Sequence, residues 1–269
     1  MNAESILSMP AEQYHAAEGI SNSQLRILAE KTPLHLWCHM HAPPEPPTPA
    51  QRMGTLVHRC LLEPDTVEGA FYVKPEGMSF ATVDGKAWKK EHTDRPVVAT
   101  EEEDQIRSMI KSVQSHPVAK KLFSLGKPEQ SIFVKDEHGT LRKGRFDWLS
   151  ESGNILPDLK TCESAAPDDF EKSIFDYGYF RQAAFYLDLC ELIGLDKTAF
   201  AFVCVEKSAP YAVAVYNLLD DVIDAGRRLY HRDLQVYRNC VESGKWPGYG
   251  YGIASIGIPQ WAMKRLELQ

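Results

Sequence analysis

Residues 143–149 read Lys-Gly-Arg-Phe-Asp-Trp-Leu, and residues 158–161 read Asp-Leu-Lys-Thr. Both segments have the composition of short strands, and the Ser-Gly-Asn at 152–154 is typical of a turn between them. Because successive side chains of a strand point to opposite faces, Asp158 and Lys160 are predicted to share one face of the second strand. With Asp147 on the neighbouring strand, two acids and a lysine converge.

This convergence has a chemical interpretation and a purely structural one. Carboxylates on adjacent strands can bind a hard divalent cation through oxygen, and an ammonium beside them can orient or deprotonate a water molecule. Metal-assisted hydrolysis is therefore the leading hypothesis. The alternative is a β-hairpin with a surface salt bridge, because acid-x-lysine is a common sequence and exposed ion pairs are frequent.

The length and composition are those of one globular domain. The chain has 269 residues, 43% of them hydrophobic, which is enough to bury a substantial core. We expect one domain over 1–269, with a helical lead and proline-rich connector at 1–50, a core at 51–245 and an aromatic tail at 246–269. No apolar run reaches membrane-spanning length, and the N-terminus lacks the features of a secretory signal, so a cytoplasmic protein without membrane contact is expected.

Cysteine spacing and net charge narrow the classes of function. The six cysteines are scattered without a C-x-x-C pair, so neither a zinc ribbon nor an iron–sulfur cluster is expected. The formal charge of −7 argues against a polycationic nucleic-acid binder. It leaves room for a local basic channel, because metal ligands themselves add negative charge.

Two predicted helices in the first quarter of the chain carry polar residues that invite a functional interpretation. Ser21, with Ser23 after it, opens a helix; its hydroxyl either caps that helix or, with the free amides there, binds a phosphate. Apolar spacing predicts a second helix at 53–62, in which Gly54 and His58 lie one turn apart. His58 is either a satisfied structural partner or a ligand, and Gly54 indicates close approach by another backbone or a ligand.

A change of pattern after Glu129 predicts a β-sheet. Its strands are expected to form an antiparallel meander through turns at His138-Gly139 and Ser152-Gly153, with strands at 130–135, 141–149 and 154–160. Glu129 lies at the start of this sheet and could reach the same metal as the two aspartates.

The C-terminal half returns to helices and buried strands. A helix from about 177 to 193 places Gln182 and Tyr186 one turn apart. The apolar run at 199–205 is typical of a fully buried strand, with 211–216 as its neighbour. Together the elements predict a mixed α/β (α+β) fold with a central mixed β-sheet flanked by helices.

Three further segments carry open interpretations. A helix starting at Asp220 or Asp221 bears Arg227, Arg228, His231, Arg232 and Arg238, which either pair with neighbouring acids or contact phosphates. Residues 64–99 form a loop-rich excursion that could cover a site, and the aromatic tail is expected to pack back on the domain.

In sequence order, the notable features are Ser-x-Ser opening a helix, Gly54-x-x-x-His58, Glu129, Gly-Arg-Phe-Asp147, Asp158-x-Lys160 and Gln182-x-x-x-Tyr186. This ordered set resembles the RecB-like branch of the PD-(D/E)xK nucleases. Within that branch it is most similar to the nuclease domains of the RecE (exonuclease VIII) type, over nearly the whole chain. Each motif is common alone, and the specificity lies in their order and spacing.

The resemblance implies a role for each matching residue, and the fold implied is the restriction-endonuclease-like core. Asp147 and Asp158 would be metal-binding catalytic acids, Lys160 the lysine that positions or activates water, and His58 a further metal ligand. Glu129 would be an auxiliary catalytic acid. The residues that would brace the site or contact DNA are Gln182, Tyr186, Arg145, and Ser21 or Ser23 near a 5′ phosphate.

Two positions depart from the pattern of that family. Asp147 follows Phe146 rather than the proline of the family name. Pro157 instead precedes Asp158, where it predicts a strand that is locally irregular or near an edge.

By the same resemblance, the protein would be a Mg²⁺-dependent exonuclease, with Mn²⁺ able to substitute and without an iron–sulfur cluster. It would digest one strand of duplex DNA from the 5′ end and leave a 3′ single-stranded tail for recombination by annealing. Expected partners are duplex DNA ends, an annealing protein of the RecT type, and further copies of the chain in a ring, by resemblance a tetramer. Alternatives are a structure-selective or single-strand nuclease of the same fold, or a catalytically silent DNA-binding or assembly module.

Overall fold

The computed structural model describes residues 6–43, 46–63, 68–250 and 252–267. Part of the predicted connector (44–45), the start of the excursion (64–67) and Tyr251 of the tail lie outside the described residues. The elements follow in the order β1 (Ile6–Ser8), α1 (Ala11–Ala16), α2 (Asn22–Glu30), α3 (Pro33–His41), α4 (Pro49–Leu62), β2 (Tyr72–Val73), α5 (Val83–Glu91), β3 (Val97–Val98), α6 (Thr100–Ser115), α7 (Pro117–Leu122), β4 (Gly126–Lys135), β5 (Leu141–Ser150), β6 (Ile155–Cys162), α8 (Pro167–Asp176), α9 (Tyr179–Leu192), β7 (Ala199–Glu206), β8 (Val213–Asn217), α10 (Asp220–Ser243) and α11 (Gln260–Glu267).

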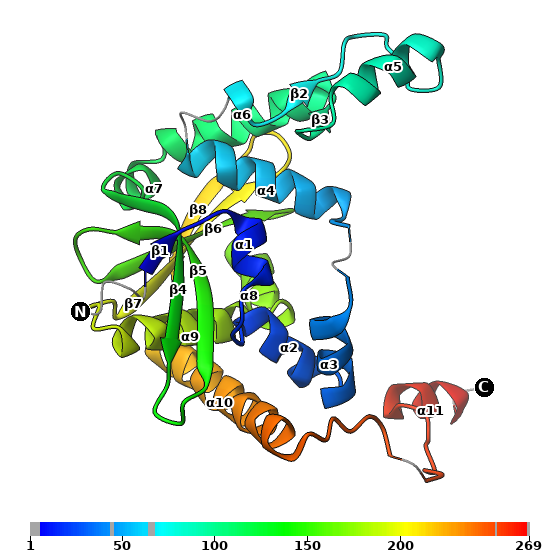
Figure 1. Ribbon diagram of the computed structural model, residues 1–269, viewed down its shortest axis with the longest axis vertical. Coiled ribbons are helices and arrows are strands. Elements are labelled where there is room, and N and C mark those ends of the chain that lie inside the picture. The colour runs from blue at the N-terminus through cyan, green and yellow to red at the C-terminus, as the bar shows by residue number, and fades with distance from the viewer. Residues whose placement is uncertain (1–5, 44–45, 64–67, 251, 268–269) are drawn as a thin grey trace.

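Two three-stranded sheets form the centre of the molecule (Figure 1). In the first, β4 lies between β1 and β5 and pairs antiparallel with both. In the second, β7 lies between its parallel partner β6 and its antiparallel partner β8. The sheets lie side by side, because β5 contacts β6. The mixed α/β class is confirmed, as are the hairpin at His138-Gly139 and the pairing of the buried strand with its predicted neighbour.

The predicted antiparallel pairing of β5 with β6 through Ser152-Gly153 is wrong. Within the described ranges no ladder of backbone hydrogen bonds joins these strands, and β6 is aligned along its length with β7 instead. Pro157 has no N–H to donate, and the Leu159 N–H donates to the Asp147 carboxylate at 2.8 Å. A side chain thus takes the place of a main-chain acceptor. The single central sheet of the prediction is therefore two sheets that meet where the acids lie.

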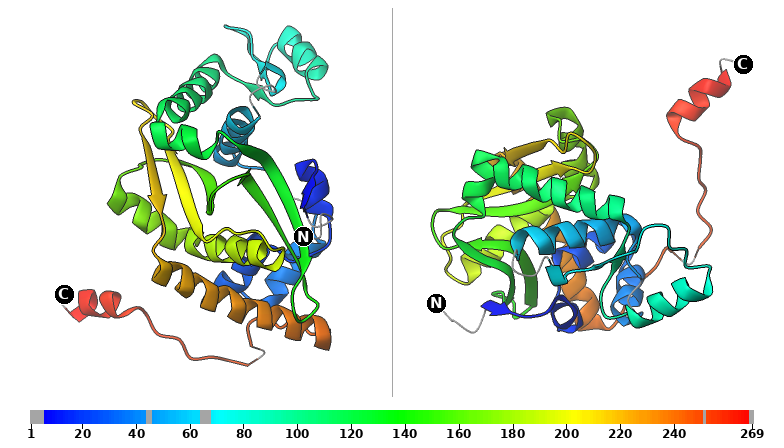
Figure 2. Two further views of the ribbon diagram at one scale, coloured as in Figure 1. Left: turned by 90° about the vertical axis from the view of Figure 1, so that its left-hand side faces the viewer. Right: turned by 90° about the horizontal axis from the view of Figure 1, so that it is seen from above.

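Helices cover both sides of this double sheet and bury two apolar cores (Figure 2). The first core lies against α2, α3, α9 and α10, and the second against α4, α6 and α7. Strand β7 contributes to both, because Phe200, Phe202 and Cys204 point into the first and Val203 and Val205 into the second. Burial on both faces explains why this strand reads as a continuous apolar run.

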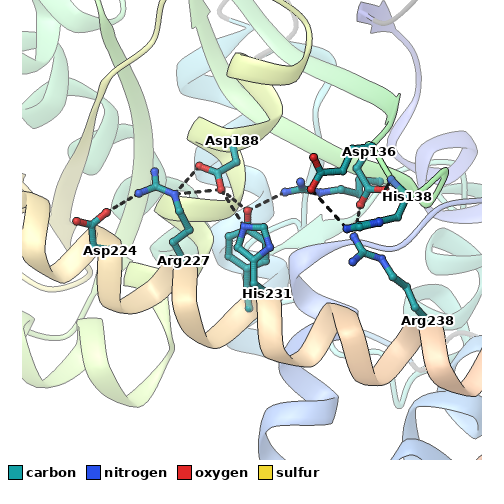
Figure 3. Close-up of polar contacts among 10 residues, drawn as sticks. Asp136, His138, Asp188, Asp224, Arg227, His231 and Arg238 are labelled. Carbon is teal, nitrogen blue, oxygen red and sulfur yellow. Dashed lines mark hydrogen bonds and ion pairs between the residues drawn. The ribbon is translucent and has the colours of Figure 1, made fainter.

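A buried polar network fastens α10 to the first sheet and to α9 (Figure 3). The buried Arg142 of β5 donates to the Tyr230 hydroxyl at 3.2 Å, and that hydroxyl donates to the carboxylate of Asp188 on α9. Arginines of α10 form the ion pairs Arg227–Asp188, Arg227–Asp224, Arg232–Asp233 and Arg238–Asp136. Three of the four arginines predicted on this helix thus pair with acids, and the phosphate role stays a prediction.

The excursion between α4 and α6 is more regular than predicted. It contains α5 and the short parallel pair of β2 with β3, and Figure 1 shows it extending from one end of the molecule. Phe80, Trp88 and His92 stack on one another within it, so its aromatic residues mainly serve its own packing.

The tail returns to the domain only at its start. Trp246 packs against the first core, and the Pro247 carbonyl accepts from the Leu34 N–H at 3.1 Å. Beyond it, Trp261 is 69% exposed, and α11 lies away from the body of the molecule (Figures 1 and 2). The expectation that the tail packs back is therefore wrong for α11. Within the described ranges, none of the helices combines the length and apolar character that crossing a bilayer would require.

Candidate active site

The register of β4 and β5 sets two carboxylates opposite each other. Pro128 aligns with Trp148 and Gln130 with Phe146, so Glu129 faces Asp147 across the ladder. Like charges at directly opposite positions are destabilising. Glu129 also has a φ of 53°, a left-handed conformation that is costly for a residue with a side chain. A strained residue with an unfavourable charge opposite it points to a functional position.

Helix α4 brings His58 to the same place. Its Nδ1 lies 3.4 Å from Asp147 Oδ2. The helix contacts both β5 and β6. A Cβ on Gly54 would lie 3.5 Å from the Thr161 hydroxyl, which is an ordinary van der Waals distance, so among the described residues this position does not require glycine and the predicted close approach of another backbone is not seen.

The residues brought together are suited to a hard divalent cation. One ligand atom from each of His58, Glu129 and Asp147 can be chosen so that all three lie within 4.8 Å of one another. Two carboxylates and one imidazole form an oxygen-rich donor set, which suits Mg²⁺ or Mn²⁺ better than Zn²⁺. A cation there would also relieve the repulsion between the two facing acids. The residues present therefore fit the expected metal, with Glu129 in this group where Asp158 was predicted.

The ionisation of these groups follows from their contacts. Burial alone raises the pKa of Asp147, but His58, Lys160 and the Leu159 N–H outweigh it and hold the pKa below its ordinary value. Burial alone lowers the pKa of His58, but the Asp147 carboxylate raises it above its ordinary value. The pKa of Glu129 is raised by burial and by Asp147. Asp147 is thus the acid that stays ionised to bind a cation.

Beside this cluster, Asp158 and Lys160 form an ion pair on β6. Lys160 Nζ lies 2.5 Å from Asp158 Oδ2, and Gln182 Nε2 on α9 donates to Asp158 Oδ1 at 2.8 Å. Burial raises the pKa of Asp158 to about 6. Burial would lower the pKa of Lys160, but Asp158 and Asp147 raise it to about 12. Lys160 therefore carries a proton at neutral pH, so it acts as a cationic hydrogen-bond donor before any cation binds.

Arg145 and Tyr186 support the site from behind. Arg145 Nε lies 2.6 Å from Glu129 Oε2, while its Nη1 donates to the Met9 carbonyl and the Ser131 hydroxyl. The Tyr186 ring packs on Phe146 at 5.1 Å between centroids. These contacts give Arg145 a positioning role for Glu129, and they place Tyr186 against the strand that carries Asp147.

The structure does not bring Ser21 and Ser23 to the carboxylates. Ser21 accepts from the Gln24 N–H in a capping box and its hydroxyl contacts that of Ser23 at 2.9 Å. Ile20 bridges to Arg142, which lies five positions before Asp147 on β5 and so about 16 Å from it along the strand. The structural alternative, a helix cap, is present, and the phosphate role stays a prediction.

Two aromatic residues of the site have no counterpart among the predicted residues. The Lys160 ammonium lies 4.8 Å from the centre of the Tyr179 ring and 5.7 Å from that of Phe202. Both are visible in the sequence once the fold is known. Tyr179 lies one helical turn before Gln182, and Phe202 aligns with Asp158 in the parallel register. Neither relation is recognisable before α9 and β7 are placed against β6.

Comparisons with known proteins bear on the family and the fold of the chain. Residues 21–256 match the family described as "PDDEXK-like domain of unknown function (DUF3799)". A search of curated proteins finds no match. Among solved structures, a protein from Eubacterium rectale described as "Putative exonuclease" has a TM-score of 0.65 at 14% identity, over 96% of this chain and 98% of that one. The structure of SSO0001 has a TM-score of 0.30 at 15% identity, over 72% of this chain and 96% of that one. This similarity is too low to bear on the fold.

At such identities the solved structures bear on the fold alone, and the fold is of the PD-(D/E)xK kind. Because the family match spans most of its length, the chain belongs to the family of PDDEXK-like domains of unknown function (DUF3799).

Proposed function

We propose that the protein is a metal-dependent nuclease that hydrolyses phosphodiester bonds of DNA. One observation carries the proposal: His58, Glu129 and Asp147 gather their ligand atoms within 4.8 Å of one another, directly beside the Asp158–Lys160 ion pair. A binding module has no need for facing acids in a strained register together with a half-buried lysine. Hydrolysis of a phosphate ester needs both a cation site and a positioned donor.

The contacts of each site residue indicate its role in hydrolysis. A bound divalent cation would neutralise the phosphate and lower the pKa of an attacking water. Lys160, protonated and held by Asp158, donates to the water or to a phosphate oxygen. Asp158 accepts from Gln182 and so keeps its carboxylate oriented. Glu129 is held by Arg145, which fixes one wall of the cation site.

The finer proposal rests on the ordered motifs shared with RecE-type nuclease domains. By that resemblance the enzyme digests one strand of linear duplex DNA from the 5′ end and leaves a 3′ single-stranded tail. A ring of identical chains and an annealing protein of the RecT type belong to the same proposal. A ring would help an acidic chain bind DNA, because a modest basic lining is repeated by symmetry.

The test uses linear duplex DNA labelled at either end, incubated with and without Mg²⁺ or Mn²⁺. Wild-type protein is expected to degrade it only with the metal, and Lys160→Ala and Asp147→Ala are expected to lower the rate about 10²- to 10⁴-fold. Lys172→Ala removes an exposed lysine of a surface ion pair and is expected to leave the rate unchanged.

The outcomes separate the alternatives. Binding of DNA without degradation would refute the nuclease and indicate a catalytically silent DNA-binding module. Release from the 3′ end would refute the polarity, and equal digestion of closed circles would indicate an endonuclease. Preferential cleavage of single strands or branched DNA would support a structure-selective nuclease.

A further inference from the structure

The segment between α8 and α9 presents an exposed aromatic ring close to Lys160. Tyr177 is 53% exposed, and its ring lies 5.5 Å from that of Tyr179 at an angle of 30°. Tyr179 is the ring whose centre lies 4.8 Å from the Lys160 ammonium. A single aromatic ring therefore separates the exposed Tyr177 from the ammonium.

The backbone around Tyr177 is tightly bonded. The Tyr177 N–H donates to the Ser173 carbonyl at 2.9 Å, and its carbonyl accepts from Arg26 Nη1 on α2 at 3.1 Å. Gly178 follows with a φ of 65°, which ends α8 and starts α9 in a direction that other residues rarely adopt. The ring is thus presented on a fixed backbone, whose carbonyl is bound by Arg26, and the same arginine forms an ion pair with Glu30.

An exposed tyrosine alone would need no explanation, because much of any protein surface is apolar. This one is continuous with the site through Tyr179. A ring face next to a phosphate-hydrolysing centre matches a nucleobase, since every base has a π-face and stacks on aromatic side chains without sequence preference. A base can reach such a ring only after it has left the duplex stack.

We propose that Tyr177 forms a stacking subsite for an unpaired nucleobase of the strand being cut, adjoining the phosphate that Lys160 contacts. The inference rests on the proposed nuclease function and adds to it the form of the substrate. The end of the duplex must be opened at the site, so the enzyme binds a frayed or single-stranded terminus more tightly than a fully paired one.

The test measures affinity by fluorescence anisotropy in Ca²⁺, with duplexes whose 5′ end carries a short unpaired tail. One set has ordinary bases in the tail and the other has abasic residues. Wild-type protein is expected to bind the ordinary tail about 5- to 100-fold more tightly than the abasic one. Tyr177→Ala is expected to lose that difference, and Tyr177→Phe to keep it.

Tyr249→Ala is the matched control, because Tyr249 is 75% exposed and its ring contacts His35 on α3. It is expected to behave like the wild type. The subsite is refuted if Tyr177→Ala keeps the preference for ordinary bases or lowers the affinity for both tails equally. It is also refuted if the wild type binds both tails with the same affinity.

Cleavage by the same samples in Mg²⁺ separates this inference from the proposed function. Degradation with no base preference would refute the subsite alone. A base preference that depends on Tyr177, without degradation, would refute the nuclease and leave the subsite. Failure to bind DNA would refute both.

Discussion

Replacing Gln182 by leucine tests whether the orientation of Asp158 matters for catalysis. The amide of Gln182 donates to the buried Asp158 carboxylate at 2.8 Å from the neighbouring helix α9. Leucine is of similar size but donates nothing. Of the contacts seen among the described residues, Asp158 then keeps its ion pair with Lys160, and its carboxylate can rotate away from the position that the site requires.

The size of the effect follows from the kind of bond removed. A hydrogen bond to a charged group contributes about 1.5–3 kcal/mol. If that energy is lost in the transition state, the rate falls about 10- to 100-fold, the range typical when a residue that orients a metal-site ligand is replaced. Gln182→Glu is expected to be worse, because a second carboxylate beside Asp158 raises the pKa of Asp158 further and favours its protonated form.

The assay is single-turnover hydrolysis of end-labelled linear duplex DNA, with enzyme in excess and with Mg²⁺ or Mn²⁺. Thermal unfolding of each variant shows that the measured protein is folded. Gln235→Leu is the control, because Gln235 bonds to Asn239 on the exposed face of α10. A Gln182→Leu rate within about twofold of the wild type, or an equal loss in the control, would refute the role assigned to this bond.

Three further predictions concern the metal site and the core. Because a proton on His58 excludes a cation and the pKa of His58 is raised, Mn²⁺ affinity measured calorimetrically should fall up to about tenfold per pH unit once the pH is below that pKa; His58→Asn should flatten this dependence, and an equally steep profile in that variant would contradict the assignment. Gly226→Ala places a methyl group against a carbonyl oxygen of α9 and should cost about 1–3 kcal/mol and several degrees of melting temperature, whereas Gly250→Ala, with nothing within 4 Å, should not. Tyr230→Phe removes the hydroxyl that donates to Asp188 and should cost about 1–3 kcal/mol in urea unfolding; an unchanged midpoint would show that the network adds no stability.

Periodicity in the sequence was enough to group some site residues. Two-residue alternation placed Asp158 and Lys160 on one face of a strand. In the structure, Lys160 Nζ lies 2.5 Å from Asp158 Oδ2. Helical spacing placed Gln182 and Tyr186 one turn apart, but their contacts differ. Gln182 reaches Asp158 and Tyr186 packs on Phe146, because the direction in which each side chain points depends on how α9 lies across the strands.

The pairing of strands could not be read in the same way. A turn signal at Ser152-Gly153 favours a hairpin, yet β6 pairs with β7. The choice depends on a proline without an N–H and on an aspartate side chain that accepts the Leu159 N–H. Both residues can be seen in the sequence. Whether the Leu159 N–H bonds to a side-chain or a main-chain acceptor is decided only when the strands are close together.

Local patterns in the chain, which act over a few residues, were sufficient for the mixed α/β class, for the helix that presents His58 and for the strand that carries both Asp158 and Lys160. Contacts between distant segments account for the rest: the alignment of Glu129 opposite Asp147, the closeness of His58 to both, and the Tyr179 ring beside Lys160. Those contacts arise from packing two sheets and several helices at once. No short stretch of sequence contains the information that specifies them.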